Sequence, residues 1–205
     1  NYNDLLLIIE KTKDQIIKDV FFTGFFTGLR LAELLNLRWN MIDFTSRIIT
    51  LKQSESFTTK SKKERIIPIN NALFEILSRI SKSKINKNDD SLVFTNAKQL
   101  PLQGDWISKS FKRAVRAAKL NDDIHFHSLR HSFASSLIQS GVSLYVVKEL
   151  LGHKDFTTTQ IYSHIITKNL SDAVKNLEPE KLQIKNVVKG TIENNPIMKY
   201  DICLN

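Results

Sequence analysis

RIITLKQSESFTTKSKKERIIPIN, residues 47–70, interrupts a chain that is otherwise patterned for helices. Its two ends, Arg47–Gln53 and Glu64–Asn70, are short and rich in isoleucine, which is typical of β-strands. The polar, basic residues between them predict a hairpin loop. Pro68 has no backbone N–H to donate, so it places the second strand at a sheet edge or marks the strand's end. This stretch therefore predicts a small antiparallel sheet early in the chain.

Apolar residues at helical spacing lie on both sides of this hairpin. Leu73, Leu77 and Ile80 recur three or four residues apart, and Ser143 and Gly152 supply an N-cap and a C-terminal stop. We expect helices over Asp14–Gly28, Leu31–Trp39, Asn71–Ile80, Trp106–Leu120, His127–Gly141 and Ser143–Gly152. The predicted fold class is mostly α with a small antiparallel β-sheet (α+β).

The helical pattern breaks after Pro179. We therefore expect one domain over residues 1–178 and a C-terminal tail over residues 179–205, in which Lys181–Val188 alternates enough for a strand. The chain begins at Asn1 rather than Met, so we expect a fragment that lacks something upstream.

Composition favours a polyanionic partner. The chain has 30 Lys and Arg against 21 Asp and Glu, a formal charge of +9, and nucleic acid is the commonest partner of such a domain. An anionic membrane surface is the alternative partner, although the sequence has no run of about 18 apolar residues that could span a bilayer. One cysteine, Cys203, excludes a disulfide framework or a cysteine-based zinc site within the chain. We expect a cytoplasmic protein with no signal peptide.

Arg30 follows FFTG and opens a predicted helix. A guanidinium at a helix N-terminus makes an anion site, although the helix dipole disfavours a cation there. Glu33 lies three residues further on the same face, where it would orient Arg30 or simply be an acid that the dipole favours. Taken alone, both residues are also explained as an ordinary helix surface.

His127, Arg130 and His131 share one face of a later helix, in the sequence HSLRH. The i, i+4 histidines would suit a metal, but a zinc-protease helix needs HExxH, and Ser128 stands where the glutamate should be. The cationic Arg130 beside them would repel a metal ion. We therefore expect no metal and an anion instead, naturally a phosphodiester. His131 by itself is explained as a packed helix histidine.

The stretch LGHKDFTTTQIYSH, residues 151–164, places His153 just after a helix-ending glycine and Tyr162 nine residues later (162 − 153). Tyr162 alone fits a core aromatic, and tyrosine is a weak nucleophile at its free pKa of about 10. Nearby cations can stabilise its phenolate and a pentacoordinate phosphate. The chain offers such groups at Arg30, Lys60, His127, Arg130 and His153. Together they predict phosphoryl transfer without a metal or other cofactor.

Four separated segments carry a family resemblance: TGLRLAELLNLRW (27–39), TKSKKERIIPI (59–69), HSLRHSFASSLIQSG (127–141) and LGHKDFTTTQIYSH (151–164). Together they resemble the catalytic domain of tyrosine recombinases, the phage integrase family. The order and spacing match from about Asp14 to Leu177. The resemblance implies the fold of that domain and a site-specific recombinase or integrase that cleaves and rejoins DNA.

The resemblance also implies a role for each matching residue. Arg30 and Arg130 would clamp the scissile phosphate. His127 and His153 would contact the same phosphate, and His127 would also move a proton. Tyr162 would be the nucleophile and would form a 3′-phosphotyrosyl bond to DNA. Because that bond conserves energy, no ATP or metal is needed for religation through a Holliday junction.

Two further roles follow from the resemblance. Lys60 would be the general acid for the leaving 5′-hydroxyl, although Lys62 and Lys63 lie close enough to leave the register open. Glu33 would be the accessory acid that supports the site.

The implied partners are a double-stranded DNA recombination site, further copies of the chain in a tetramer, and accessory DNA-bending or directionality proteins. We expect this fragment to lack the family's amino-terminal DNA-clamping domain and therefore to bind DNA weakly. The tail would dock on a neighbouring subunit, or fold back in cis. Two rival interpretations stay open: a type IB topoisomerase-like enzyme with the same chemistry, and a non-catalytic DNA-binding module. The second leaves the spacing of the arginines, histidines and tyrosine to coincidence.

Overall fold

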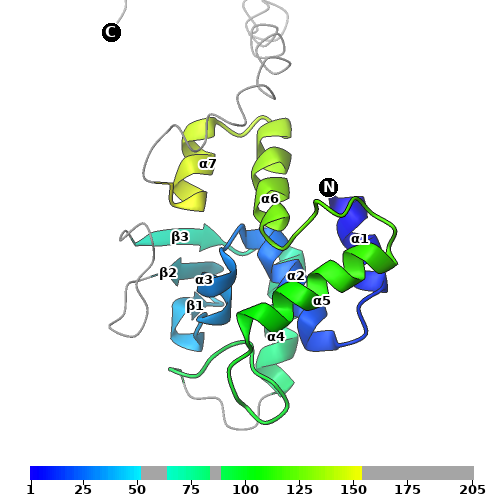
Figure 1. The fold of residues 1–205 in the computed structure, drawn as a ribbon. Helices are drawn as coiled ribbons and strands as arrows, with labels where there is room; N and C mark the ends of the chain where they lie inside the picture. The colour runs from blue at the N-terminus through cyan, green and yellow to red at the C-terminus, as the bar shows by residue number, and fades with distance from the viewer. Residues whose placement is uncertain (52–63, 84–88, 154–205) are drawn as a thin grey trace, which may run out of the picture. The chain divides into compact units, whose positions relative to one another are not determined.

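Seven α-helices, a short 3₁₀ helix and three strands make up the described part of the chain, residues 1–51, 64–83 and 89–153 of a computed structural model (Figure 1). All of these residues belong to one compact unit. The elements are α1 Tyr2–Glu10, α2 Gln15–Thr27, α3 Leu31–Leu35, η1 Trp39–Met41, β1 Ile42–Asp43, β2 Ile48–Leu51, β3 Arg65–Pro68, α4 Asn71–Ser83, α5 Gly104–Ala117, α6 His127–Gln139 and α7 Leu144–Leu151. The predicted fold class is confirmed.

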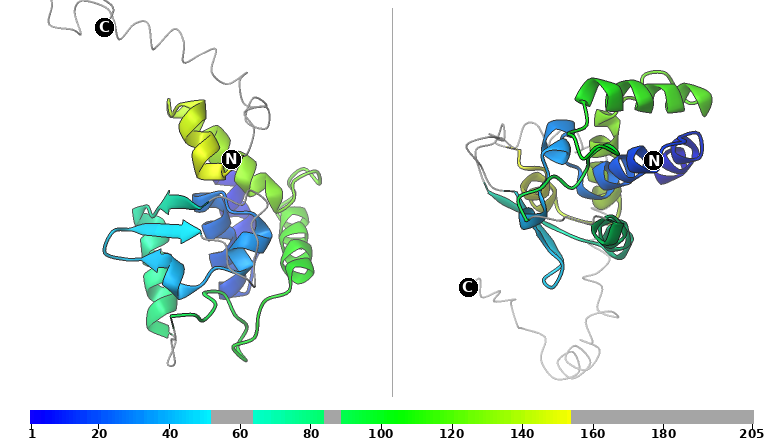
Figure 2. Two further views of the ribbon diagram at one scale, coloured as in Figure 1. Left: turned by 90° about the vertical axis from the view of Figure 1, so that its left-hand side faces the viewer. Right: turned by 90° about the horizontal axis from the view of Figure 1, so that it is seen from below.

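Helix α2 lies at the centre and contacts α1, α3, α4, α5 and α6. Its Val20, Phe21 and Thr23 are fully buried, because neighbours cover the helix on most sides. Figure 1 and the left view of Figure 2 place α6 and α7 at one end of the unit and α4 at the other. The end formed by α6 and α7 is the one that concerns function.

Aromatic rings hold the start of α6 against α2. The Phe21 ring meets Phe111 of α5 edge-on at 4.9 Å and Phe126, just before α6, at 6.1 Å. Gly24 lets the chain approach closely, since a Cβ there would lie 3.1 Å from Cζ of Phe126. This packing sets the position of His127, the first residue of α6.

The sheet has the order β1-β2-β3, with both pairs antiparallel. Ile49 of β2 and Ile67 of β3 face each other and are buried, whereas Ile66 is exposed. Pro68 lies in the edge strand β3, as predicted, and α7 packs beside that strand. The patterns do not predict β1, which has two residues, or α1.

The helix predicted over Leu31–Trp39 is wrong in length, because α3 has five residues. Leu37 and Trp39 are buried, and their backbone groups bond to another segment. Val93 N donates to Leu37 O at 2.8 Å, and Trp39 N donates to Ser91 O at 3.1 Å. Long-range pairing therefore wins over helix propensity here. The other predicted helices agree with the structure to within three residues at each end.

Several predictions concern residues beyond the described ranges. They are the hairpin loop, the tail strand Lys181–Val188 and the domain boundary after residue 178. No described helix is long and apolar enough to cross a membrane.

Candidate functional site

The junction of α2 and α3 positions Arg30. Helix α2 ends at Gly28, whose φ of 63° is left-handed, and Arg30 is the N-cap of α3. Glu33 accepts hydrogen bonds from the backbone N of Arg30 at 2.9 Å and from its Nη1 at 3.0 Å. The Arg30 side chain remains 26% exposed. Glu33 therefore orients Arg30, one of the two roles that the sequence left open for it.

Glu33 has a second partner that sequence reasoning missed. Arg65 of β3 donates through Nη2 to Glu33 Oε2 at 2.7 Å and through Nη1 to Oε1 at 3.3 Å. Burial raises the pKa of Glu33, but the Arg65 charge and hydrogen bond, and then Arg30, outweigh it and hold the pKa below its ordinary value. The missed signal is the two-residue period of the strand, which puts Arg65 on the buried face with Ile67.

Arg130 lies on α6 and is 3% exposed. Its Nη1 donates to the backbone O of Gly28 and its Nη2 to the backbone O of Leu151, both at 2.7 Å. These carbonyls lie at the C-terminal ends of α2 and α7, where the helix dipole favours a cation. Arg130 thereby connects the C-terminal ends of α2 and α7 to the N-terminal part of α6.

His127 begins α6, one turn before Arg130. Desolvation by the surrounding protein, followed by the charges of His131 and Arg130, lowers its pKa to about 4, although the residue is exposed. The ring of His131 lies edge-on to that of His127 at 5.0 Å, but His131 is exposed, so it is not packed in the interior.

His153 follows Gly152, whose left-handed φ of 65° ends α7. Partial burial, and then the charges of Arg130, Arg30 and Arg65, lower the pKa of the half-buried His153 to about 4. Both His127 and His153 are therefore neutral at pH 7.

The structure thus brings together five of the seven predicted residues: Arg30, Glu33, His127, Arg130 and His153. The missed Arg65 joins them. We call these six residues the arginine–histidine cluster. Three guanidiniums and one carboxylate, with neutral imidazoles, leave it cationic, so it suits an anion. Lys60 and Tyr162 lie outside the described residues.

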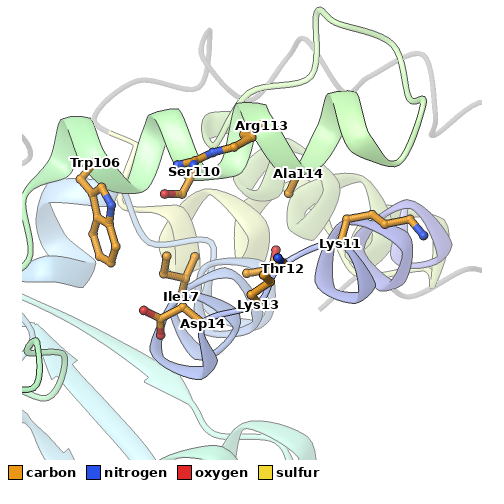
Figure 3. A pocket seen from close by; sticks show the side chains of 9 residues that line it. All are labelled: Lys11, Thr12, Lys13, Asp14, Ile17, Trp106, Ser110, Arg113 and Ala114. Atoms are coloured by element: carbon orange, nitrogen blue, oxygen red, sulfur yellow. The ribbon is translucent and has the colours of Figure 1, made fainter.

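No group of three or more His, Cys, Asp or Glu side chains is placed to hold a metal ion in the described ranges. A separate pocket of about 410 Å³ lies between the turn after α1 and helix α5 (Figure 3). Lys11, Lys13 and Arg113 line it with Trp106 and the buried Ser110. It contains no residue of the arginine–histidine cluster, so the two features are distinct.

The Phage integrase family matches residues 1–169. A tyrosine recombinase of Thermosipho africanus (strain TCF52B) is 35% identical over 153 residues, which cover 75% of this chain and 51% of that protein. The chain spans about half the length of the curated relatives that it matches.

The solved structures that resemble this chain include an integrase and a site-specific recombinase. The catalytic domain of bacteriophage HP1 integrase is 27% identical with a TM-score of 0.63, over 87% of this chain and 94% of that one. The XerH site-specific recombinase, bound to palindromic difH substrate in a post-cleavage complex, is 26% identical with a TM-score of 0.66. That match covers 87% of this chain and 52% of the XerH chain.

Proposed function

Because the chain belongs to the phage integrase family, we propose that it is the catalytic part of a site-specific DNA recombinase. The observation that carries the proposal is the arginine–histidine cluster, which gathers residues from α3, β3, α6 and the end of α7 around a cationic centre. The XerH site-specific recombinase, which has a similar fold, is bound to its palindromic difH substrate, and this supports a DNA site as the partner of this basic chain.

In the proposed reaction, the scissile phosphate lies against Arg30 and Arg130. The bonds from Arg130 to two backbone carbonyls hold its guanidinium before DNA arrives, so little reorganisation is needed. His127 and His153 are neutral at pH 7 and can each donate one hydrogen bond to a phosphate oxygen. The arginines thus supply positive charge, while the imidazoles orient the phosphate through hydrogen bonds.

The chemical step is a transesterification. The Tyr162 oxygen forms a bond to phosphorus, and the bond from phosphorus to the 5′-oxygen breaks. Lys60 gives a proton to that oxygen, and His127 takes the proton of the tyrosine hydroxyl. The 3′-phosphotyrosyl link keeps the bond energy, so a 5′-hydroxyl of another strand reverses the step. Two rounds of exchange pass through a Holliday junction without nucleotide or metal.

The assembly follows from the same proposal. Residues 1–178 form the catalytic domain, an assignment supported by the 94% coverage of the HP1 integrase domain. A tetramer on DNA, accessory DNA-bending or directionality proteins and a cytoplasmic location remain predictions.

The test uses nicked duplexes drawn from the sequences that flank the gene, with EDTA present, and a denaturing gel. We expect a covalent protein–DNA band that disappears in Tyr162→Phe. Tyr145→Phe is the matched control, because Tyr145 is exposed on α7 and lies outside the arginine–histidine cluster. A band that survives in Tyr162→Phe contradicts the nucleophile, and one that EDTA removes contradicts the metal-free step. If no duplex gives a band, the proposed activity of this chain is wrong.

A further inference from the structure

Arg65 occupies an unusual place for a charged side chain. It lies in strand β3, is 7% exposed, and donates hydrogen bonds from both Nη atoms to the carboxylate of Glu33. Even when it is paired, a buried guanidinium adds little net stability, because the cost of desolvation offsets the attraction to the carboxylate, so Arg65 calls for an explanation beyond simple stability. The proposed reaction assigns Arg65 no part.

The hydrogen bonds of Glu33 show what Arg65 does for Arg30. Oε1 accepts from Arg30 Nη1 at 3.0 Å and from Arg65 Nη1 at 3.3 Å, and Oε2 accepts from Arg30 N at 2.9 Å and Arg65 Nη2 at 2.7 Å. Each carboxylate oxygen is therefore shared between the two arginines. Without Arg65, the whole charge of Glu33 would fall on Arg30 and weaken its attraction for a phosphate.

Arg65 also contacts the turn that carries His153. A Cβ at Gly152 would lie 3.2 Å from Arg65 Cζ and closer still to Nη1, so the guanidinium lies directly against the Gly152 backbone. On the preceding residue, the Leu151 carbonyl accepts from Arg130. Arg65 and Arg130 thus both brace the turn before His153.

We propose that Arg65 is a positioning residue of this site, which shares Glu33 with Arg30 and braces the Gly152–His153 turn so that Arg30 and His153 face one phosphate. The inference rests on the proposed recombinase function and adds a residue to it. Arg65 reaches the reacting atoms only through its neighbours. A displacement of about 1 Å in such a site can cost roughly 100-fold in rate.

The test compares two arginines in the 205-residue chain. Arg65→Lys keeps the charge but loses the paired nitrogens, and Arg65→Gln removes the charge. Arg79→Lys and Arg79→Gln are matched controls, because Arg79 of α4 also bonds to a buried carboxylate, that of Asp19, outside the arginine–histidine cluster. Thermal unfolding first establishes the folded fraction of each variant.

The readouts are single-turnover cleavage of a nicked duplex that the unsubstituted chain cleaves, DNA affinity, and the pKa of His153 by NMR. We expect Arg65→Lys to bind DNA within about twofold of the unsubstituted chain but to cleave it roughly 10- to 100-fold more slowly. In Arg65→Gln we expect the pKa of His153 to rise, because one of the charges that lower it is gone. The Arg79 variants should leave the cleavage rate, the DNA affinity and the pKa of His153 unchanged.

The outcomes separate the two proposals. If folded Arg65→Lys cleaves as fast as the unsubstituted chain, or if its slower cleavage is fully accounted for by its lower folded fraction, Arg65 is not a positioning residue. An unchanged His153 pKa in folded Arg65→Gln contradicts the contact with the turn. If the unsubstituted chain cleaves no duplex, the recombinase proposal itself fails, and the role of Arg65 fails with it.

Discussion

The role of each site residue in this protein depends on the residues that surround it in the fold. Taken alone in the sequence, Arg30 and Glu33 are explained as an ordinary helix surface, yet the Glu33 carboxylate is 2% exposed and holds two arginines. Arg130 shows the same effect, since its burial follows from carbonyls supplied by Gly28 and Leu151. The motif residues could be predicted from the chain, but the contacts that make them cooperate could not.

The two site histidines should respond to pH and to DNA. Their pKa of about 4 lies below the ordinary 6.5, because desolvation and neighbouring cations disfavour the imidazolium. His127 and His153 therefore contribute stability above pH 6.5 that is lost as the pH falls from 6.5 towards 4. A DNA phosphate among the cations should raise both pKa values.

NMR titration of the imidazole signals, with and without DNA, measures this shift, and Tyr162→Phe prevents covalent reaction during the experiment. Because the bound pKa is the higher one, DNA affinity should also increase as the pH falls below the bound value. Values that stay near 4 with DNA bound would show that no phosphate lies beside these rings.

Gly152 and Gly141 allow a paired test of the turn before His153. Both have positive φ, so alanine costs about 1–2 kcal/mol at either position. At Gly141 a Cβ meets nothing within 4 Å, whereas at Gly152 it meets the guanidinium of Arg65. Gly152→Ala should therefore lower the free energy of unfolding by more than Gly141→Ala, and it should also slow DNA cleavage.

Denaturant unfolding and the nicked-duplex assay provide the two measurements. Equal losses of stability in the two variants, with cleavage unchanged, would mean that the Arg65 contact does not constrain the turn.

At the scale of elements, local signals succeeded where the ends of an element are encoded nearby. Helix α7 has the predicted N-cap, since the Ser143 hydroxyl accepts from Val146 N, and the predicted glycine stop. Helix α3 fails the same reasoning, because residues 37–39 bond to a segment more than 50 positions away. Strand β1 has two residues, which is too short for any periodic pattern to reveal.

The basic face of helix α5 allows two interpretations, a solvated surface or contacts with DNA phosphates. Lys112 and Arg116 both pair with Asp122, at 3.3 and 2.8 Å. Lys109 and Arg113 are exposed on the same helix and line pockets instead. If α5 contacts DNA, the double alanine variant of Lys109 and Arg113 should reduce the salt dependence of binding more than that of Lys112 and Arg116.

Each lost phosphate contact should reduce the slope of log affinity against log salt by about 0.9. Slopes measured over a series of salt concentrations decide the matter. If both double variants keep the slope of the unsubstituted chain, the basic face of α5 is only solvated.

At the scale of the whole molecule, the expected role of the C-terminal tail in assembly is the prediction that most needs a test. Residues 179–205 lie outside the described ranges, and the docking of Lys181–Val188 on a neighbouring copy stays a prediction. Removal of residues 179–205 should reduce self-association on DNA while leaving the binding of a single copy close to that of the intact chain. Analytical ultracentrifugation with a DNA duplex measures both. Unchanged self-association would remove the docking idea.

The sequence by itself determined the composition of the helices and the hairpin, the basic charge and the motif residues, because these depend on local period and residue type. The two-residue period of β3 could place Arg65 on the buried face, but the sequence could not reveal its pairing with Glu33, 32 positions earlier in the chain. Only the tertiary structure decided that the two imidazoles share the surroundings that keep them neutral. The physical reason is that burial and electrostatic interactions depend on distance in space, and the chain reports only distance along itself.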